Sequence, residues 1–432
     1  MRWRVRQVGL GLVLACLGGT LLLGILLKSQ PTISDGRLSF PCAQGEWTGQ
    51  QYTRLCYSDI VPLYGTEHLE GGRIPYVDAC PSGSGQCDEY PVVTMFAMYL
   101  TAAPARHVAA DPGTAFGAFF LSNAVLLALA AGVTAIGLYM MAGRRALWFA
   151  LAPTLLIYGF MNWDLLAVAL ATAATVAFLS RRDVAAGILI GLGAAAKLYP
   201  ALLVVPFVAH RLRDREPDGA IHLCWAAAGT WLAVNLPFAL LGPHGWSEFF
   251  RFNTQRVSDF DSLWYVGCDV VRGHAPCLSA GAVNVLSAVT FVLGSILVWF
   301  AKKRRDPDFP RWTFVLPFLI LFLLTNKVYS PQYGLWLLPW FALAMPSLGP
   351  ISPFGLFVLF EVTDVAVFIS RFTWFATLPP YNVGGAPKWS FELAVVLRAA
   401  VLVACLVAFV RQRAGQMEPR AVPQLAPAEA VR

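Results

Sequence analysis

Six short polar clusters interrupt an otherwise apolar chain, and their residue types suit acid–base chemistry beside an anion-binding site. Two clusters carry the carboxylates of Asp59 and Glu89, and three carry the cations Lys197, Arg256 and Lys327. Charged groups are expensive near hydrocarbon, so ionisable residues in such a chain are more often functional than incidental. The same clusters supply further groups for a polar substrate: Tyr57, Asn162, Asp164, Tyr199, Asn253, Gln255, Tyr329 and Gln332.

The acidic residues have two interpretations each. Asp59 follows the first apolar run, where a partly desolvated carboxylate can act as a general base. It can equally cap the short helix expected after it, which is a common use of Asp. Asp88 and Glu89 can cap the apolar segment that follows them, and Asn162 and Asp164 can cap the next apolar run.

The cations point to a phosphate. Lys197 has no acidic residue close in sequence, and a buried ammonium needs an anion or several carbonyl groups nearby. The alternative is that its long side chain reaches the membrane surface. With Arg256 and Lys327 added, the cations describe a site for a phosphate-bearing lipid. Neighbouring aromatic residues such as Tyr199 and Trp336 can stack on sugar faces, although interfacial aromatic belts also place Trp and Tyr there.

The elements that must position these clusters are membrane-spanning helices. The chain has 432 residues, 57% of them hydrophobic, with a mean hydropathy of +0.60 and apolar runs long enough to cross a bilayer. The net charge of +7 comes from short basic clusters between these runs. That distribution is typical of cytoplasmic loops, so no nucleic-acid partner is expected. ATP-driven transport also lacks support, because no Walker A loop is present.

The fold class expected is an all-α polytopic membrane protein with about ten transmembrane helices, both termini in the cytoplasm and the polar clusters on the exoplasmic side of the plasma membrane. A single domain over residues 1–413 is expected, with a first exoplasmic loop at 28–114 and a disordered cytoplasmic tail at 414–432. The expected spans are 8–27, 115–141, 146–161, 163–180, 220–241, 282–301, 312–326, 332–347, 352–370 and 389–410.

Two apolar segments fit no simple crossing. Residues 184–209 have basic residues at both ends, yet they are too short to cross the ~30 Å core twice at 1.5 Å per residue. A re-entrant hairpin with its tip at Lys197 resolves this conflict, and one long tilted span is the alternative. Residues 91–104 are better suited to an interfacial helix than to a crossing.

The cysteines agree with this topology. Six of the nine lie in segments expected to be exoplasmic, where an oxidising exterior favours disulfides: Cys42, Cys56, Cys80, Cys87, Cys268 and Cys277. Six cysteines allow fifteen pairings. Sequence proximity favours Cys42 with Cys56, Cys80 with Cys87, and Cys268 with Cys277.

Taken in order, the polar clusters resemble glycosyltransferase family 87, of the GT-C membrane class. This family includes polyprenyl-phosphate-mannose-dependent α-mannosyltransferases, among them the phosphatidylinositol mannosyltransferase E type. The resemblance covers about residues 1–411. The motifs that carry it are Tyr57-Ser58-Asp59-Ile60, Glu89-Tyr90-Pro91, Asn162-Trp163-Asp164, Ala196-Lys197-Leu198-Tyr199-Pro200, Phe252-Asn253-Thr254-Gln255-Arg256 and Lys327-Val328-Tyr329-Ser330-Pro331-Gln332-Tyr333.

The resemblance implies a GT-C fold in which Asp59 is the catalytic residue and Lys197, Arg256 and Lys327 bind the donor phosphate. The expected reaction transfers a sugar, mannose above all, from a polyprenyl-phosphate carrier to a lipid-linked or cell-envelope glycan. No cofactor and no metal are expected, and a metal held near Asp59 and Glu89 is the alternative. The residues after Arg256 depart from the family's usual Arg-Gly-Leu-Gln, which leaves the acceptor open. The alternatives are a carrier or flippase for lipid-linked sugars, and an inactive partner in an envelope-synthesis complex.

Overall fold

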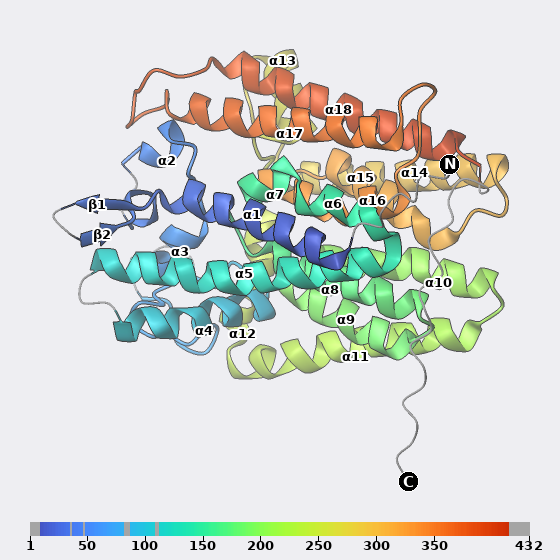
Figure 1. The fold of residues 1–432 in the computed structure, drawn as a ribbon, viewed down its shortest axis with the longest axis horizontal. Helices are drawn as coiled ribbons and strands as arrows, with labels where there is room; N and C mark the ends of the chain where they lie inside the picture. The colour runs from blue at the N-terminus through green and yellow to red at the C-terminus, as the bar shows by residue number, and fades with distance from the viewer. Residues whose placement is uncertain (1–8, 35–36, 46–47, 82–86, 109–111, 414–432) are drawn as a thin grey trace, which may run out of the picture.

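The protein is a bundle of α-helices with one small β-hairpin (Figure 1). This computed structural model describes residues 9–34, 37–45, 48–81, 87–108 and 112–413. The disordered tail expected at 414–432 lies outside the described residues. The all-α polytopic class expected from the sequence is confirmed, whereas the single domain over 1–413 stays a prediction.

Six helices of the described residues are long and apolar enough to cross a membrane. Five of them are α1 (Leu10–Ser29), α11 (Pro217–Leu241), α14 (Ala280–Arg305), α17 (Pro353–Phe375) and α18 (Lys388–Arg411). The sixth is the stretch Thr114–Ala150, most of which is α5 (Pro112–Ala142). Five of the six coincide with expected spans to within five residues, because their apolar runs fix both their position and their length. The stretch Thr114–Ala150 covers the expected span 115–141 and the start of the expected span 146–161.

The other four expected spans are built from shorter or broken helices. They are α6 (Ala146–Ala150) with α7 (Pro153–Tyr158), α8 (Asp164–Leu179), η4 (Arg311–Phe314) with α15 (Val315–Thr325), and η5 (Pro331–Trp336) with α16 (Leu338–Ala344). The continuous helix expected over 146–161 is therefore wrong in detail. Pro153 interrupts it, and Glu361 of α17 accepts hydrogen bonds from the backbone and hydroxyl of Thr154 at 2.8 and 2.7 Å.

The hairpin expected over 184–209 is present. Helix α9 (Asp183–Ala196) leads to Lys197, the 3₁₀ helix η3 (Tyr199–Leu203) turns the chain, and α10 (Val204–Arg213) returns. The two ends meet, because Arg211 forms an ion pair with Asp183 at 2.8 Å. Lys197 is consequently carried at the tip, away from that paired end.

Close packing against α11 fixes the first arm of this hairpin. A Cβ on Gly187 would lie 2.5 Å from the carbonyl oxygen of Leu223, and one on Gly191 would lie 2.6 Å from that of Ala227. Glycines four residues apart let two membrane helices approach to backbone contact. This spacing sets the position of α9 and therefore of Lys197.

The segment between α1 and α5 holds the only strands among the described residues. It contains β1 (Thr32–Ser34), β2 (Arg37–Ser39), η1 (Pro41–Ala43), α2 (Gln50–Thr53), α3 (Ile60–Thr66) and α4 (Val92–Val108). The strands pair antiparallel, with Ile33 opposite Leu38. These elements gather at one end of the bundle (Figure 1). The interfacial helix expected at 91–104 corresponds to α4.

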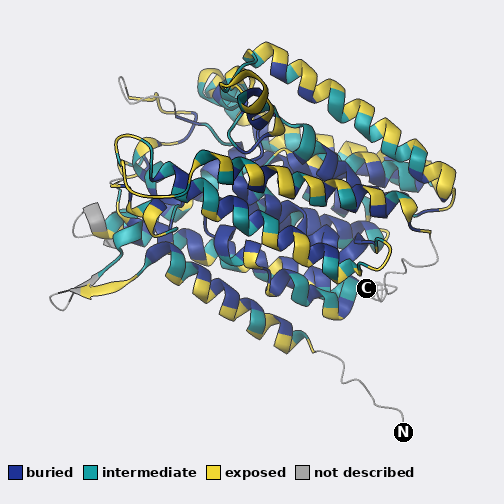
Figure 2. Cartoon of the chain, turned by 90° about the horizontal axis from the view of Figure 1, so that it is seen from above, coloured by how far each residue is buried: buried dark blue, intermediate teal, exposed yellow. Residues whose placement is uncertain are grey.

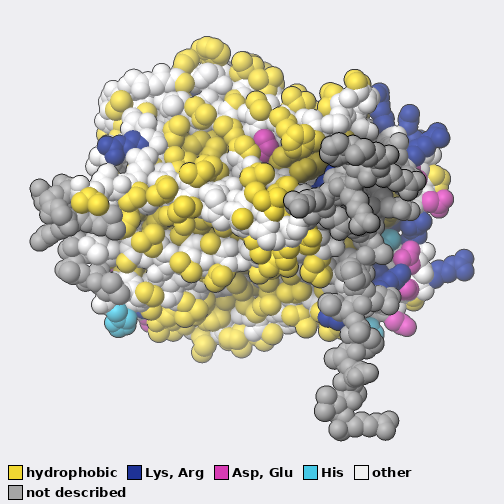
Figure 3. Space-filling model, viewed as in Figure 1, with side chains coloured by type: hydrophobic (Ala, Val, Ile, Leu, Met, Phe, Trp, Pro, Cys, Tyr) yellow, Lys and Arg dark blue, Asp and Glu magenta, His cyan; other side chains and the backbone are white. Residues whose placement is uncertain are grey.

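The remaining described elements are η2 (Gly143–Arg145), α12 (Pro243–Gln255) and α13 (Leu263–Arg272). Buried residues concentrate in the middle of the bundle, whereas the outer helices expose many side chains (Figure 2). On the face shown in Figure 3, hydrophobic side chains cover the middle and charged ones gather at the end opposite the β-hairpin. An apolar belt between polar ends is the surface a bilayer requires.

Candidate active site

The Asp59 carboxylate is held by two side chains. Its Oδ1 accepts a hydrogen bond from the Tyr57 hydroxyl at 2.6 Å, and its Oδ2 accepts one from the Asn162 amide at 2.9 Å. Asp59 makes no side-chain cap for α3, so the capping interpretation does not describe this structure. Because each carboxylate oxygen has a second lone pair, it can still accept a hydrogen bond from a substrate hydroxyl.

The backbone around Asp59 is anchored to neighbouring elements. The Asp59 N–H donates to the carbonyl oxygen of Met161 at 2.8 Å, and the Ser58 hydroxyl donates to that of Phe160 at 2.8 Å. From α1, the buried Lys28 ammonium donates to the carbonyl oxygen of Tyr57 at 2.7 Å. These long-range bonds fix the carboxylate relative to the residues that precede α8.

Lys197 has a protein anion as its partner, which the sequence did not indicate. Its Nζ lies 3.3 Å from Oδ2 of Asp164, whose Oδ1 accepts a hydrogen bond from the Trp336 indole at 2.7 Å. The anion that the sequence analysis required for Lys197 is thus supplied in the structure by Asp164, 33 positions away, because α8 and the hairpin tip meet only in the fold. The ammonium also lies 5.5 Å from the ring centroid of Tyr90 and 5.3 Å from that of Tyr333.

Lys327 is held by carbonyl groups and not by a carboxylate. Its ammonium donates to the backbone oxygen of Asn253 at 2.7 Å and to that of Arg256. Burial, together with the nearby Arg256 charge, lowers the pKa of Lys327 from 10.5 to about 8. Arg256 itself pairs with Asp259 at 2.9 Å. Lys327 therefore remains a cation without a full counter-charge.

One cavity of about 460 Å³ joins these groups, a size within the range of small-molecule sites. Most residues predicted from the sequence line it: Tyr57, Asp59, Glu89, Asn162, Lys197, Tyr199, Asn253, Arg256, Lys327 and Gln332. The side chains come from segments spread over most of the chain. A cavity with carboxylates and several cations in its lining can remove a proton and stabilise a phosphate within one site.

Three predicted residues do not line the cavity. Asp164 is fully buried behind it and acts through Lys197 and Trp336. Tyr329 is buried with its ring 3.7 Å from the Arg398 guanidinium. Gln255 is the last residue of α12 and is exposed. Their assigned role in substrate binding stays a prediction without geometric support.

Arg371 is a cavity-lining cation that the sequence reasoning missed. It lies on α17, forms an ion pair with the buried Asp261 at 2.6 Å, and leaves its Nε without a hydrogen-bond partner among the described residues. An arginine directly after the expected span 352–370 is the signal that could have found it. Asp259 and Tyr90 also line the cavity and were not predicted.

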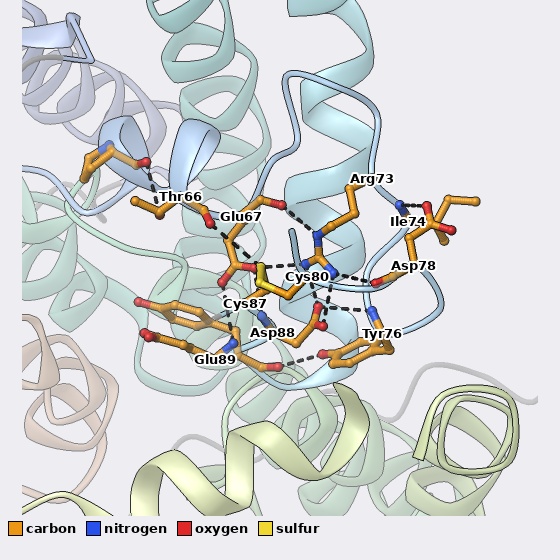
Figure 4. A network of polar contacts seen from close by, with 12 residues as sticks. Thr66, Glu67, Arg73, Ile74, Tyr76, Asp78, Cys80, Cys87, Asp88 and Glu89 are labelled. Atoms are coloured by element: carbon orange, nitrogen blue, oxygen red, sulfur yellow. Dashed lines mark hydrogen bonds and ion pairs between the residues drawn. A yellow bond between two sulfur atoms is a disulfide. The ribbon is translucent and has the colours of Figure 1, made fainter. Parts of the chain in front are cut away.

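Glu89 reaches the cavity from a buried ionic network in the first loop, drawn in Figure 4. There Arg73 pairs with Asp88 at 2.8 Å and with Glu67 at 3.1 Å. Glu67 also accepts hydrogen bonds from the backbone N–H groups of Asp88 and Glu89. The Asp88 carboxylate therefore pairs with Arg73, and the alternative that Asp88 caps the following helix finds no support. Burial raises the pKa of Glu89 above its usual range.

Three disulfides form in the pairing that sequence proximity favoured: Cys42–Cys56, Cys80–Cys87 and Cys268–Cys277. The second one closes the loop in front of Asp88 and Glu89 (Figure 4). Within the part of the chain that the structure describes, no three His, Cys, Asp or Glu residues form a group that could hold a metal. The expectation that no metal is needed stays a prediction.

Comparison with known proteins decides the family. Residues 90–326, more than half of the chain, match the family model of glycosyltransferase family 87. The chain belongs to glycosyltransferase family 87. No curated protein matches it. The family 87 segment contains Asn162, Lys197 and Arg256, whereas Asp59 precedes it and Lys327 follows it by one residue.

Membership of glycosyltransferase family 87, with six candidate spans, makes the protein a multi-pass membrane glycosyltransferase. Its substrates are accordingly a sugar donor and a glycan acceptor. The cavity around Asp59 is the candidate place for that transfer, because carboxylates and four cations lie in its lining.

Proposed function

We propose that this family 87 enzyme transfers a sugar, mannose in the first instance, from a polyprenyl-phosphate donor to a lipid-linked or cell-envelope glycan, with inversion at the anomeric carbon. The observation that carries the proposal is the fixed Asp59 carboxylate in the same cavity as Lys197, Arg256 and Lys327. The choice of mannose and of a polyprenyl carrier rests on the resemblance of the polar motifs.

In the proposed step the acceptor hydroxyl attacks the anomeric carbon from the face opposite the phosphate. The new bond forms between the acceptor oxygen and this carbon while the bond from the carbon to the phosphate oxygen breaks. The hydroxyl proton goes to Asp59, and the electron pair leaves with the polyprenyl phosphate. Tyr57 and Asn162 orient the carboxylate that takes the proton.

The cations stabilise the phosphate as it leaves. Lys327 is the best placed of them in electrostatic terms, because its partners are neutral carbonyl groups. Lys197, Arg256 and Arg371 each have a carboxylate partner, so each adds a smaller net charge. Preorganised donors of this kind contribute about 3–4 kcal/mol each to a transition state. No step requires a metal or another cofactor.

The transfer is proposed to take place at the exoplasmic side of the plasma membrane, with both termini in the cytoplasm. The first two disulfides belong to the segment between α1 and α5, which also carries Asp59, and oxidising compartments favour disulfides. The third disulfide joins Cys268 in α13 to Cys277, which lies shortly before α14. Asp269 of α13 also pairs with Lys388 at the start of α18, so the first residues of α14 and α18 lie at the same end of the bundle as this disulfide. The other end of α14 carries the basic residues 302–305, which the positive-inside bias assigns to the cytoplasm.

A carrier or flippase for lipid-linked sugars is the rival, since it would use the same cationic cavity. It would have no need for a carboxylate held by two donors. The deciding experiment measures transfer of radiolabelled mannose from polyprenyl-phosphate-mannose to membrane acceptors by the purified protein. Wild type should transfer and Asp59→Asn should not, with donor binding intact in both. Transfer by neither protein, with the donor still bound, would count against mannose or against the transferase proposal.

A further inference from the structure

A second, larger cavity lies away from the candidate active site. Its volume is about 910 Å³, and its walls come from η2, α6, the start of α7 and the first half of α17. Along α17, Phe354 lines this groove and Arg371 lines the active-site cavity. Those positions are about 26 Å apart along a helix, so the two cavities lie near opposite ends of α17.

The walls of the groove are apolar and aromatic. Trp148 stacks on Phe357 with ring centroids 5.3 Å apart, and its centroid is 5.5 Å from that of Phe354. Phe354, Leu151 and Val362 are exposed although they line a concave surface. In a chain that spans a bilayer, an exposed apolar groove of this kind has the chemistry to hold acyl chains.

The rim of the groove is cationic. Arg144 and Arg145 line it, and no carboxylate of the described residues lies within ion-pair distance of either guanidinium. The Arg145 guanidinium lies 5.5 Å from the Trp148 ring centroid, which keeps it over the groove. The lining also contains one acidic residue, Glu361, whose Oε2 accepts hydrogen bonds from the backbone N–H and the hydroxyl of Thr154.

The start of α17 adds to this positive rim. Ser352 and Pro353, at the N-terminus of this helix of 23 residues, line the same cavity. The N-terminus of a long helix carries a partial positive charge that favours an anion. Here the Ser352 hydroxyl already accepts a hydrogen bond from the Gly355 N–H, so the helix contributes its dipole. Two arginines and a helix N-terminus therefore meet at the mouth of an apolar groove.

We propose that this groove binds one anionic phospholipid of the surrounding membrane. Its phosphate contacts Arg144 and Arg145, and an acyl chain lies along Trp148, Phe354 and Phe357. Arginine suits this role because its planar guanidinium forms paired hydrogen bonds with phosphate oxygens. A basic rim beside an apolar groove between membrane helices is the arrangement that recognises anionic head groups.

Quenching of Trp148 fluorescence tests the proposal with the full-length protein in nanodiscs. Phosphatidylcholine discs receive a small fraction of either brominated phosphatidylglycerol or brominated phosphatidylcholine. Because the chain has 14 Trp residues, the Trp148 signal is taken as the difference between wild type and Trp148→Phe. Brominated phosphatidylglycerol should quench it with an apparent affinity roughly 30-fold above that of the neutral lipid.

Two double variants separate the arginines of the groove from basic charge in general. Arg144→Gln with Arg145→Gln should remove the preference for the anionic lipid. Arg181→Gln with Arg213→Gln should keep it, because those arginines pair with Glu216 and Asp308 outside the groove. Equal quenching by the two brominated lipids in wild type, or loss of preference in both double variants, would overturn the proposal.

A competition measurement on wild type covers the case in which the groove variant does not fold. Unlabelled phosphatidylglycerol should relieve the quenching, and unlabelled phosphatidylcholine at the same concentration should not. Relief by both lipids alike would mean that ordinary annular lipid fills the groove and would contradict a selective site.

Discussion

The amide of Asn162 donates a hydrogen bond of 2.9 Å to the carboxylate of Asp59, although the two residues are 103 positions apart in sequence. The same amide nitrogen donates to the Tyr90 hydroxyl at 2.8 Å, and the side-chain oxygen Oδ1 of Asn162 accepts from the Trp163 backbone N–H at 2.6 Å. Asn162 therefore joins the first loop to the start of α8, and the candidate base has a fixed orientation before any substrate binds.

Asp59→Asn should lower sugar transfer by about 10²–10⁴-fold, because the amide keeps the shape of the side chain but cannot take the proton. Binding of the polyprenyl-phosphate donor should remain within a factor of a few. Transfer assays and donor binding on the same purified samples check this. Asp218→Asn, in the first turn of α11 and outside the cavity, is the matched control and should behave as wild type. Full activity in Asp59→Asn would remove Asp59 as the base.

Tyr57→Phe should lower kcat by about 10- to 100-fold, because a hydrogen bond to a charged group is worth about 1.5–3 kcal/mol. The KM for the donor should change little, since Tyr57 acts on the carboxylate and not on the phosphate. Tyr99→Phe in α4, which does not line the cavity, controls for loss of a hydroxyl. An effect on KM alone would contradict the positioning role.

The pH dependence of donor binding should report Lys327. Because its pKa is lowered to about 8, the ammonium is present below that pH and lost above it. The KM for the donor should therefore rise as the pH increases through about 8, with kcat/KM falling in parallel. Lys327→Arg should abolish this alkaline limb, because the arginine side chain stays charged over the whole pH range of the assay. An unchanged limb in Lys327→Arg would assign it to another group.

Arg371→Gln should weaken donor binding by about 10-fold or more, because it removes a cavity cation and leaves Asp261 buried without its ion-pair partner. Arg371→Lys should recover part of the affinity, since a cation is retained. Donor titrations with both variants, alongside thermal unfolding, separate binding from folding. Equal affinity in wild type and in a folded Arg371→Gln variant would exclude a contact with the donor.

Arg73→Met should destabilise the protein by about 3–5 kcal/mol, because it leaves the carboxylates of Glu67 and Asp88 buried without a cation. The loop that carries Glu89 should lose its order as well (Figure 4). Thermal unfolding in detergent measures the first effect, and limited proteolysis between α3 and α4 measures the second. Arg54→Met, at an exposed position, is the control and should unfold like wild type.

The membrane class and the positions of the long helices could be predicted from the sequence, because hydropathy acts locally. A run such as 220–241 must lie in hydrocarbon whatever its neighbours do, and α11 occupies Pro217–Leu241. Proline positions were less informative, since Pro153 breaks a helix while Pro237 lies inside one. The backbone N–H of Thr154, which follows Pro153, donates its hydrogen bond to Glu361, which is distant in sequence.

The residue types of the candidate site could also be predicted, because charged and amide groups are costly in an apolar chain and therefore stand out. Asp59, Lys197 and Lys327 were predicted on this basis and line one cavity. The sequence could not show which polar groups satisfy one another. Pairing depends on distances between helices, so the Lys197–Asp164 ion pair became visible only in the fold.

The sequence by itself determined that this chain spans a membrane, that it presents cations and carboxylates in a fixed order, and that its motifs resemble those of family 87. Only the tertiary structure decided that Arg371 shares the cavity with Asp59 and that Asp164 lies behind Lys197. The physical reason is that local hydropathy fixes where helices lie along the chain, whereas the packing of distant helices fixes which side chains meet.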